Sequence, residues 1–132
     1  MQSVKNVRVL IPFDDEFIER EKEIKDLYKK SQNKICDSNS YETVRDNTFF
    51  YVFFLDEKLI GIIYYFEENG MLFFNGCSNK KMFPINVECI KLSTTWFNTK
   101  IYAEAQNRAS ALCLLKSGFV RKKSNLFVYN PK

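Results

Sequence analysis

The 132-residue sequence contains no histidine, only 4 glycines and 3 prolines, and no pair of cysteines with the C-x-x-C spacing. Its cysteines are single residues far apart in the chain: Cys36, Cys77, Cys89 and Cys113. Zinc sites and disulfide frameworks both need closer or patterned ligands, so we expect neither a metal site nor disulfides. Cys113 stands between leucines, and such apolar neighbours favour buried thiols in a reducing compartment.

The sequence also lacks a long apolar run and a strong charge of one sign. No segment approaches the roughly 20 apolar residues that a membrane-spanning helix needs, and the N-terminus MQSVKNVRVL has no signal-peptide core. We therefore expect a cytoplasmic protein with no membrane partner. The net charge of +4 is small and dispersed, which argues against a nucleic-acid partner but leaves room for the phosphates of a small ligand.

Apolar and aromatic residues are abundant instead, with 45% hydrophobic residues, 13 Phe and 7 Tyr. This content predicts one packed domain over residues 1–132. Three aromatic, β-branched runs joined by short polar turns predict an antiparallel meander: Thr48–Leu55, Leu59–Phe66 and Met71–Asn75. The runs are almost continuously apolar, so we expect helices on both faces of the sheet.

The remaining segments predict the order β-α-α-β-β-β-α-β-α-β, an α/β (α+β) fold. A first strand over Val7–Phe13 precedes an amphipathic helix over Glu16–Lys30, which Asp14 and Asp15 introduce. After a polar loop over Ser31–Ser40, we expect a short helix at Tyr41–Arg45 and, after the meander, a helix over Pro84–Phe97 with Ile85, Cys89, Leu92 and Trp96 on its buried face. The C-terminal part predicts a strand over Lys100–Ala105, a helix over Asn107–Ser117 ended by Gly118, and a last strand or hairpin over Phe119–Tyr129.

The segment NRASALCLLKSGF, from Asn107 to Phe119, resembles the C-terminal motif of the GNAT N-acetyltransferases. Asn107, Ser110, Lys116 and the Gly-Phe pair that follows are in register with that family's pattern, and the preceding strand has the family's alternation. The similarity at the level of motifs is confined to about residues 71–129. It implies a GNAT-like mixed, mostly antiparallel sheet with helices on both faces.

The resemblance also implies a binding mode for acetyl-CoA. In this family the fourth and fifth strands diverge, the pantetheine arm lies between them, and the pyrophosphate binds to backbone amides at the next helix N-terminus. Carried over to this chain, the cofactor-binding residues are Asn75, Gly76, Cys77, Lys81, Ile85, Asn86, Asn107 and Ser110. Gly76 is the expected position of a β-bulge that opens the gap, within a loop over residues 75–79 that contributes to binding.

The chain departs from the family at the pyrophosphate loop. Residues 81–86 (KMFPIN) stand where the family has a glycine-rich sequence. Lys81 keeps a cation there, but Pro84 removes an amide donor and Asn86 adds a side chain. Because a hydrogen bond to a charged group is worth about 1.5–3 kcal/mol, each lost amide is expected to weaken binding tenfold or more.

The second departure concerns catalysis, because Leu114 occupies the position of the family's proton-donating Tyr. Alternation along residues 101–105 places Tyr102 and Glu104 on one face of the strand, so these two are the catalytic candidates, with Glu104 as a base acting through water. An ion pair between Glu104 and Lys91 or Arg108 is the alternative role of that carboxylate. The other replacements considered for the missing acid are Cys113, Tyr64 and Tyr65, and Cys77 lacks a histidine to activate it as a nucleophile.

Two functional hypotheses follow. The first is an N-acyltransferase that moves an acetyl group from acetyl-CoA to a primary amine, either small or on a peptide. The second is a catalytically inactive GNAT-fold protein that serves binding or assembly, similar to the small GNAT-like proteins of bacteriophages. The sequence leaves the oligomeric state open, a homodimer included.

Overall fold

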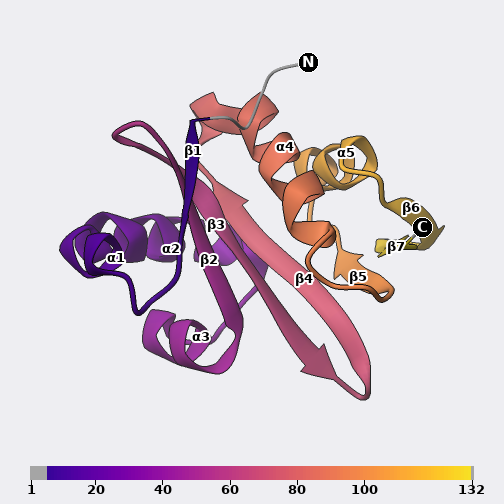
Figure 1. Ribbon diagram of the computed structural model, residues 1–132. Coiled ribbons are helices and arrows are strands. Elements are labelled where there is room, and N and C mark those ends of the chain that lie inside the picture. The colour runs from indigo at the N-terminus through magenta and orange to yellow at the C-terminus, as the bar shows by residue number, and fades with distance from the viewer. Residues whose placement is uncertain (1–5, 132) are drawn as a thin grey trace.

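The computed structural model describes residues 6–131 and contains a sheet of seven strands in the spatial order β1-β2-β3-β4-β5-β7-β6 (Figure 1). Neighbouring strands are antiparallel except β4 and β5, which are parallel. The strands are β1 Val7–Leu10, β2 Phe49–Leu55, β3 Lys58–Glu68, β4 Met71–Ser78, β5 Ile101–Glu104, β6 Val120–Lys123 and β7 Leu126–Tyr129. The predicted fold class, a mostly antiparallel sheet within an α+β fold, is confirmed.

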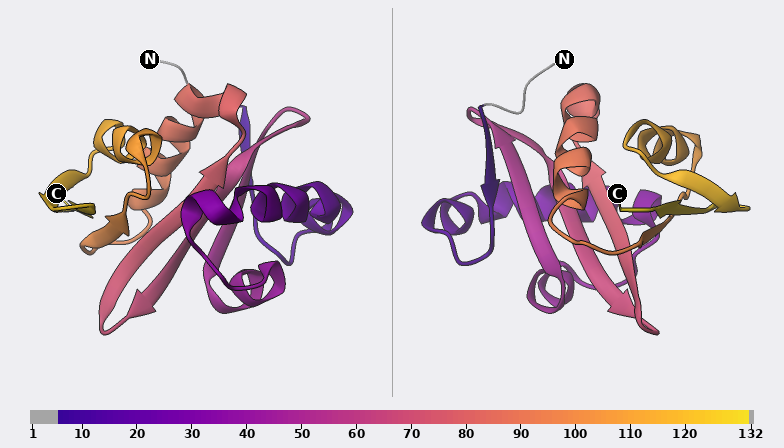
Figure 2. Two further views of the ribbon diagram at one scale, coloured as in Figure 1. Left: turned by 180° about the vertical axis from the view of Figure 1, so that it is seen from behind. Right: turned by 45° about the vertical axis from the view of Figure 1, so that its right-hand side comes forward.

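Helices cover both faces of this sheet, as the apolar strands predicted (Figure 2). The helices α1 Asp15–Glu19, α2 Glu21–Ile35 and α3 Tyr41–Asn47 lie on one face, and α4 Phe83–Thr94 and α5 Arg108–Lys116 lie on the other. Each face has its own apolar cluster: Ile24, Tyr28, Val52 and Ile62 belong to the first, and Ile63, Tyr65, Ile90 and Ile101 to the second. The sheet therefore separates two cores.

The central meander agrees with the sequence except at its end. The β3–β4 turn has Asn69 and Gly70 with φ of 56° and 76°, the positive pair that a tight hairpin requires. The prediction that β4 ends at Asn75 was wrong, because the strand continues to Ser78 and residues 76–78 are not a loop. The bulge predicted at Gly76 was also wrong, since the β3–β4 register is continuous from Gly61↔Ser78 to Glu68↔Met71.

The N-terminal helical region differs from the prediction in its divisions. The β1 strand ends at Leu10, three residues before the predicted Phe13, and the predicted helix is divided into α1 and α2 at Arg20. Ser31 and Ile35 are buried and continue the inner face of α2, so the first half of the predicted polar loop is helix. The helix ends where Cys36 adopts the left-handed conformation, with φ of 51°.

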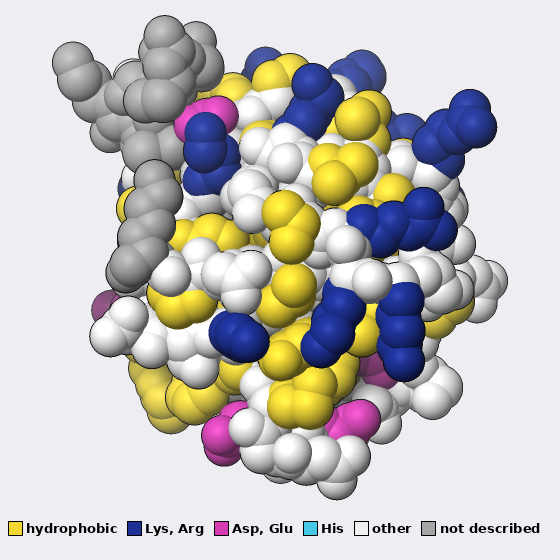
Figure 3. Space-filling view, turned by 90° about the vertical axis from the view of Figure 1, so that its right-hand side faces the viewer, with side chains coloured by type: hydrophobic (Ala, Val, Ile, Leu, Met, Phe, Trp, Pro, Cys, Tyr) yellow, Lys and Arg dark blue, Asp and Glu magenta, His cyan; other side chains and the backbone are white. Residues whose placement is uncertain are grey.

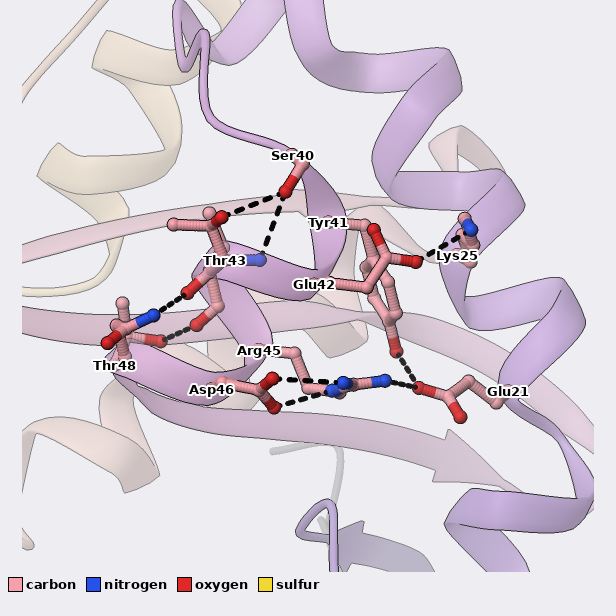
Figure 4. A network of polar contacts seen from close by, with 11 residues as sticks. Glu21, Lys25, Ser40, Tyr41, Glu42, Thr43, Arg45, Asp46 and Thr48 are labelled. Carbon is pink, nitrogen blue, oxygen red and sulfur yellow. Dashed lines mark hydrogen bonds and ion pairs between the residues drawn. The ribbon is translucent and has the colours of Figure 1, made fainter.

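A polar network fixes α3 against α2 (Figure 4). Ser40 caps α3 by accepting a hydrogen bond from the Thr43 amide at 3.1 Å. The Glu21 carboxylate on α2 accepts hydrogen bonds from the Tyr41 hydroxyl at 3.0 Å and from the Arg45 guanidinium at 2.7 Å. These contacts join the start of α2 to α3 and fix the Ser40 end of the loop over residues 36–40.

The α4 helix presents a different face to the sheet from the one predicted. It begins at Phe83, with Pro84 second, and ends at Thr94. Its buried residues are Asn86, Val87, Cys89, Ile90, Ser93 and Thr94. Trp96 lies beyond the helix, where its ring packs on Tyr51 and Phe53, so only Cys89 of the expected stripe is fully buried.

The C-terminal elements agree closely with the prediction. Ile101 and Ala103 are buried on one face of β5, whereas Tyr102 is half-buried and Glu104 exposed on the other, which confirms the predicted alternation. Asn107 caps α5 through a hydrogen bond from the Ser110 amide, and Gly118 follows the helix with φ of 102°. The last segment is the hairpin of β6 and β7.

Candidate functional site

The strands β4 and β5 pair over only part of their length. Their register consists of Leu72↔Ile101 and Phe73↔Tyr102, although β4 continues to Ser78 and β5 to Glu104. We call the point after Phe73 and Tyr102, where this pairing ends, the fork. Beyond it, β4 stays paired with β3 and β5 with β7. The arrows of the two strands separate in Figure 1. The sheet is thus interrupted between its fourth and fifth strands.

Backbone groups of both strands point into this interruption. The Asn79 amide donates to the Ile60 carbonyl at 2.9 Å, and hydrogen-bonding groups alternate in direction along an antiparallel pair. The backbone groups of Gly76 and Ser78 therefore point away from β3, toward β5. By the same argument, the bond from the Ala105 amide to the carbonyl of Asn125, the residue before β7, directs the backbone of Glu104 toward β4. The gap is therefore bordered by backbone N–H and C=O groups that do not form hydrogen bonds between β4 and β5.

The Asn75 side chain forms a hydrogen bond with one of these backbone groups. Its Oδ1 accepts the Gly76 amide at 2.8 Å, while its Nδ2 donates to the Tyr64 hydroxyl at 2.9 Å and to the Ile35 carbonyl at 3.3 Å. Tyr64 in turn donates to Asp37 Oδ2 at 2.6 Å. Burial, followed by the neighbouring Asp37, raises the pKa of Tyr64 far above its usual range, so this hydroxyl stays protonated.

This network, Asp37–Tyr64–Asn75, extends from the loop after α2 to the open edge of β4. Sequence reasoning named Asn75 and Tyr64 but missed Asp37. The contact joins residues 27 positions apart, and no sequence signal marks it.

The far end of the gap leads to the start of α4. Asn79 caps a 3₁₀ turn over Lys80–Met82, and α4 follows directly. Pro84 has no N–H, and the α-helical ladder does not use the Ile85 amide, so Ile85 is the amide of the first helical turn that can face a ligand. Asn86 is the fourth helical residue, so its amide belongs to the helical ladder.

The Asn86 side chain points into the protein instead. Its Nδ2 lies 3.9 Å from Cys113 Sγ, and its Oδ1 is the buried side-chain atom without a hydrogen-bond partner among the residues described. The added Cβ of a residue at Gly61 would lie 3.0 Å from this oxygen. Asn86 therefore joins α4 to the sheet and to α5.

Positive charge gathers beside the start of α4. Lys80 and Lys81 are exposed in the 3₁₀ turn. Lys34, at the end of α2, is close enough to Lys80 that the repulsion between the two ammonium groups lowers the pKa of Lys34. An anion placed here would relieve this repulsion.

The face of the fork opposite α4 and α5 carries aromatic side chains. Phe66 and Phe73 stack with ring centres 5.7 Å apart, and Phe73 and Tyr102 follow at 5.8 Å. All three are half-buried. Glu104 lies two residues beyond Tyr102 on the same face, and among residues 6–131 no ion pair involves it; Lys91 is 3.9 Å from Glu88 instead.

The other predicted site residues lie at different places around the gap. Asn107 uses its side chain to cap α5, next to the half-buried Ser110. Leu114 is buried in the core beneath α5, so it offers no proton where the family has Tyr. Burial raises the pKa of the Cys77 thiol to about 12, which makes it a poor nucleophile.

Two further candidates for the missing acid are Tyr65, which is buried, and Cys113, which is half-buried. The Tyr65 hydroxyl is 2.6 Å from Ser93 Oγ beneath α4, and burial raises its pKa above the usual range. Burial raises the pKa of the Cys113 thiol as well. Of the two predicted catalytic side chains, Tyr102 is half-buried and Glu104 is exposed.

The four cysteines are free thiols, and Cys36 is exposed, contrary to the expectation of burial. No cluster of three or more potential metal ligands occurs in the part of the chain that the structure describes. Within that part, none of the helices has the length and apolarity to cross a membrane.

Comparison with known proteins identifies the architecture. No protein-family model matches the chain, and neither does any curated relative. Among solved structures, the chain is similar to an N-acetyltransferase from Staphylococcus aureus Mu50, with 14% identity, a TM-score of 0.66 and coverage of 94% of this chain and 96% of that one. At this identity the similarity establishes the fold alone: the protein has the fold of the GNAT N-acetyltransferases.

Two other structures support the same fold. The ribosomal-protein-S5-alanine acetyltransferase from Vibrio fischeri has 13% identity, a TM-score of 0.64 and coverage of 92% of this chain and 89% of that one. The aminoglycoside acetyltransferase AAC(6')-Ib, in complex with coenzyme A and kanamycin, has 13% identity, a TM-score of 0.63 and coverage of 94% of both chains. The acceptors of these two enzymes are chemically unrelated, so the fold does not specify an acceptor.

Proposed function

We propose that this protein binds acetyl-CoA between β4 and β5 and transfers the acetyl group to a primary amine. The observation that carries the proposal is the fork, where two parallel strands separate after Phe73 and Tyr102 and leave backbone groups of Gly76, Ser78 and Glu104 directed into the gap. A pantetheine arm has amide and carbonyl groups that match such an edge. The similar aminoglycoside acetyltransferase has coenzyme A bound.

The phosphates would lie at the start of α4. The Ile85 amide and the helix dipole favour an anion there, and Lys81 adds a cation. The repulsion between Lys34 and Lys80 is a cost that bound phosphate would offset. We propose that these lysines compensate for the amide that Pro84 removes.

The reacting groups would meet on the aromatic face of the fork. An amine must lose a proton before it attacks the thioester carbonyl, and the departing thiolate must gain one. In the proposal, Glu104 accepts the first proton, directly or through water, and the Tyr102 hydroxyl supplies the second. Asn75, held by Tyr64, keeps the edge of β4 in place, and Asn107 and Ser110 border the gap at the start of α5.

Isothermal titration calorimetry with acetyl-CoA tests the binding step. Lys81→Gln is expected to weaken the affinity for acetyl-CoA. Lys22→Gln changes an exposed lysine at the start of α2, the end opposite Lys34, and should leave the affinity unchanged. Pro84→Ala restores an amide in the first turn of α4, so it should tighten binding by up to about tenfold. An absence of any binding heat or thermal stabilisation at millimolar acetyl-CoA would end the proposal.

Turnover is then measured as acetylated product by mass spectrometry over a panel of amines and N-terminal peptides. Glu104→Gln and Tyr102→Phe are expected to lower kcat while the affinity for acetyl-CoA stays close to that of the wild type. Tight binding without turnover of any amine would leave a binding protein and refute the enzymatic part.

A further inference from the structure

One lysine of the edge strand extends back across the sheet toward the fork. The β6–β7 register shifts between Arg121 and Lys123, so Lys122 lies outside the regular pairing of this hairpin. Its Nζ is 5.5 Å from the centre of the Tyr102 ring on β5. Strands are about 4.8 Å apart and β7 separates β6 from β5, so the side chain spans the intervening strand. Irregular pairing of this kind redirects a side chain.

Among the lysines of residues 6–131, Lys122 is the one whose ammonium group lies over an aromatic ring. Among residues 6–131, the other cations that lie over aromatic rings are arginines: Arg8, Arg20 and Arg45. The surface around β6 and α5 carries several more exposed lysines and arginines among apolar side chains (Figure 3). Lys123 is the neighbour in sequence and is also exposed, but it makes no such contact with a ring among the described residues, which makes it a matched control.

The ring that Lys122 contacts belongs to the fork itself. Tyr102 is the last β5 residue paired with β4, and its other ring neighbour is Phe73, its partner on β4. The Lys122 amine is therefore held on the aromatic face of the fork, where the thioester of bound acetyl-CoA would emerge. The Glu104 carboxylate lies on the same face and is free of ion pairs within the described residues.

We propose that Lys122 is an internal acyl acceptor, acetylated on Nζ by acetyl-CoA bound to the same chain. The inference rests on the proposed function. The ammonium first gives a proton to solvent, and its nitrogen then attacks the thioester carbonyl. A C–N bond forms, the C–S bond breaks, the second amine proton leaves, and the thiolate is protonated, so that N-acetyl-lysine and free coenzyme A are the products. Acetylation removes the positive charge over Tyr102.

The experiment uses the full chain with deuterated acetyl-CoA, and peptide mass spectrometry follows the label at each lysine. A positioned amine reacts faster than a free one, so label should enter Lys122 at least about tenfold faster than Lys123. The fraction labelled per unit time should not depend on protein concentration, and free coenzyme A should suppress labelling of Lys122 alone. Acetyl phosphate, which does not need the gap, should label both lysines at similar rates.

Variants and binding measurements separate the possible outcomes. Lys122→Arg should abolish the fast labelling, and Lys123→Arg should preserve it, while calorimetry shows that both bind acetyl-CoA as the wild type does. Equal labelling of the two lysines in a protein that binds acetyl-CoA and acetylates free amines would overturn this inference and leave the proposed function intact. Failure to bind acetyl-CoA would overturn the proposed function itself, and the internal transfer with it.

Discussion

The Tyr64 hydroxyl offers a direct test of how the edge of the gap is held. Tyr64→Phe removes one hydrogen bond to the Asp37 carboxylate, at 2.6 Å, and one from the Asn75 amide, at 2.9 Å, while it leaves the buried ring in place. A hydrogen bond to a charged group is worth about 1.5–3 kcal/mol and a neutral one about 0.5–1.5 kcal/mol. Asp37 is half-buried, so water replaces part of the first bond, and we expect a total loss of about 1.5–3 kcal/mol.

For a chain of this length, 1 kcal/mol corresponds to about 4 °C in the melting temperature. The expected decrease is therefore roughly 6–12 °C in calorimetry, with a matching fall in the urea midpoint. Tyr65→Phe is the matched control, because that hydroxyl is also buried but its partner is the uncharged Ser93. We expect it to cost about 0.5–1.5 kcal/mol.

A double-mutant cycle isolates the pair. Tyr64→Phe and Asp37→Ala should together cost less than the sum of the single changes, with a coupling of about 1–2 kcal/mol, because either change alone already breaks their bond. Additive effects, or a Tyr64→Phe variant as stable as the wild type, would refute the reasoning that this network holds the β4 edge.

Three further predictions concern the strands and the thiols. Gly76→Ala places a Cβ 2.5 Å from a β3 carbonyl oxygen, so it should lower the free energy of unfolding by about 1–3 kcal/mol in urea and weaken acetyl-CoA binding. In Gly70→Ala the added Cβ meets no atom within 4 Å. The positive φ alone should then lower the free energy of unfolding, by about 1 kcal/mol, without affecting binding. Iodoacetamide should alkylate the exposed Cys36 in the folded protein, whereas Cys77 and Cys89 should react only after unfolding, because their thiols have raised pKa values. Rapid labelling of either in the native state would contradict those raised pKa values. Stability should fall as the pH rises above 9, because these two thiols have a pKa of about 12 when folded but ionise near 9 when unfolded. Above pH 9 the unfolded chain therefore binds fewer protons than the folded one, which favours unfolding. A urea midpoint that is constant between about pH 8 and about pH 10.5 would show that the folded thiols ionise normally.

Local sequence signals predicted much of the fold because local physics determines those elements. The Asn69-Gly70 turn and the aromatic runs of the meander each specify a backbone conformation within a few residues. Alternation along residues 101–105 was enough to place Tyr102 and Glu104 on one face. The GNAT-like order of elements followed from these pieces.

The boundaries of α2 and β4 were missed because burial decided them. Ser31 continues a helix since it lies against the core, and residues 76–78 remain a strand since they pair with β3. Periodicity and propensity describe one segment at a time and do not report what a segment packs against.

The sequence alone determined the class of the fold and the residues around its fork. Only the tertiary structure decided that β4 and β5 separate after Phe73, that Asp37 supports Asn75 through Tyr64, and that Lys122 crosses β7 to reach Tyr102. The physical reason is that each of these contacts joins residues far apart in the chain, and its geometry depends on how strands and helices stack. Local backbone preferences contain no information about such contacts.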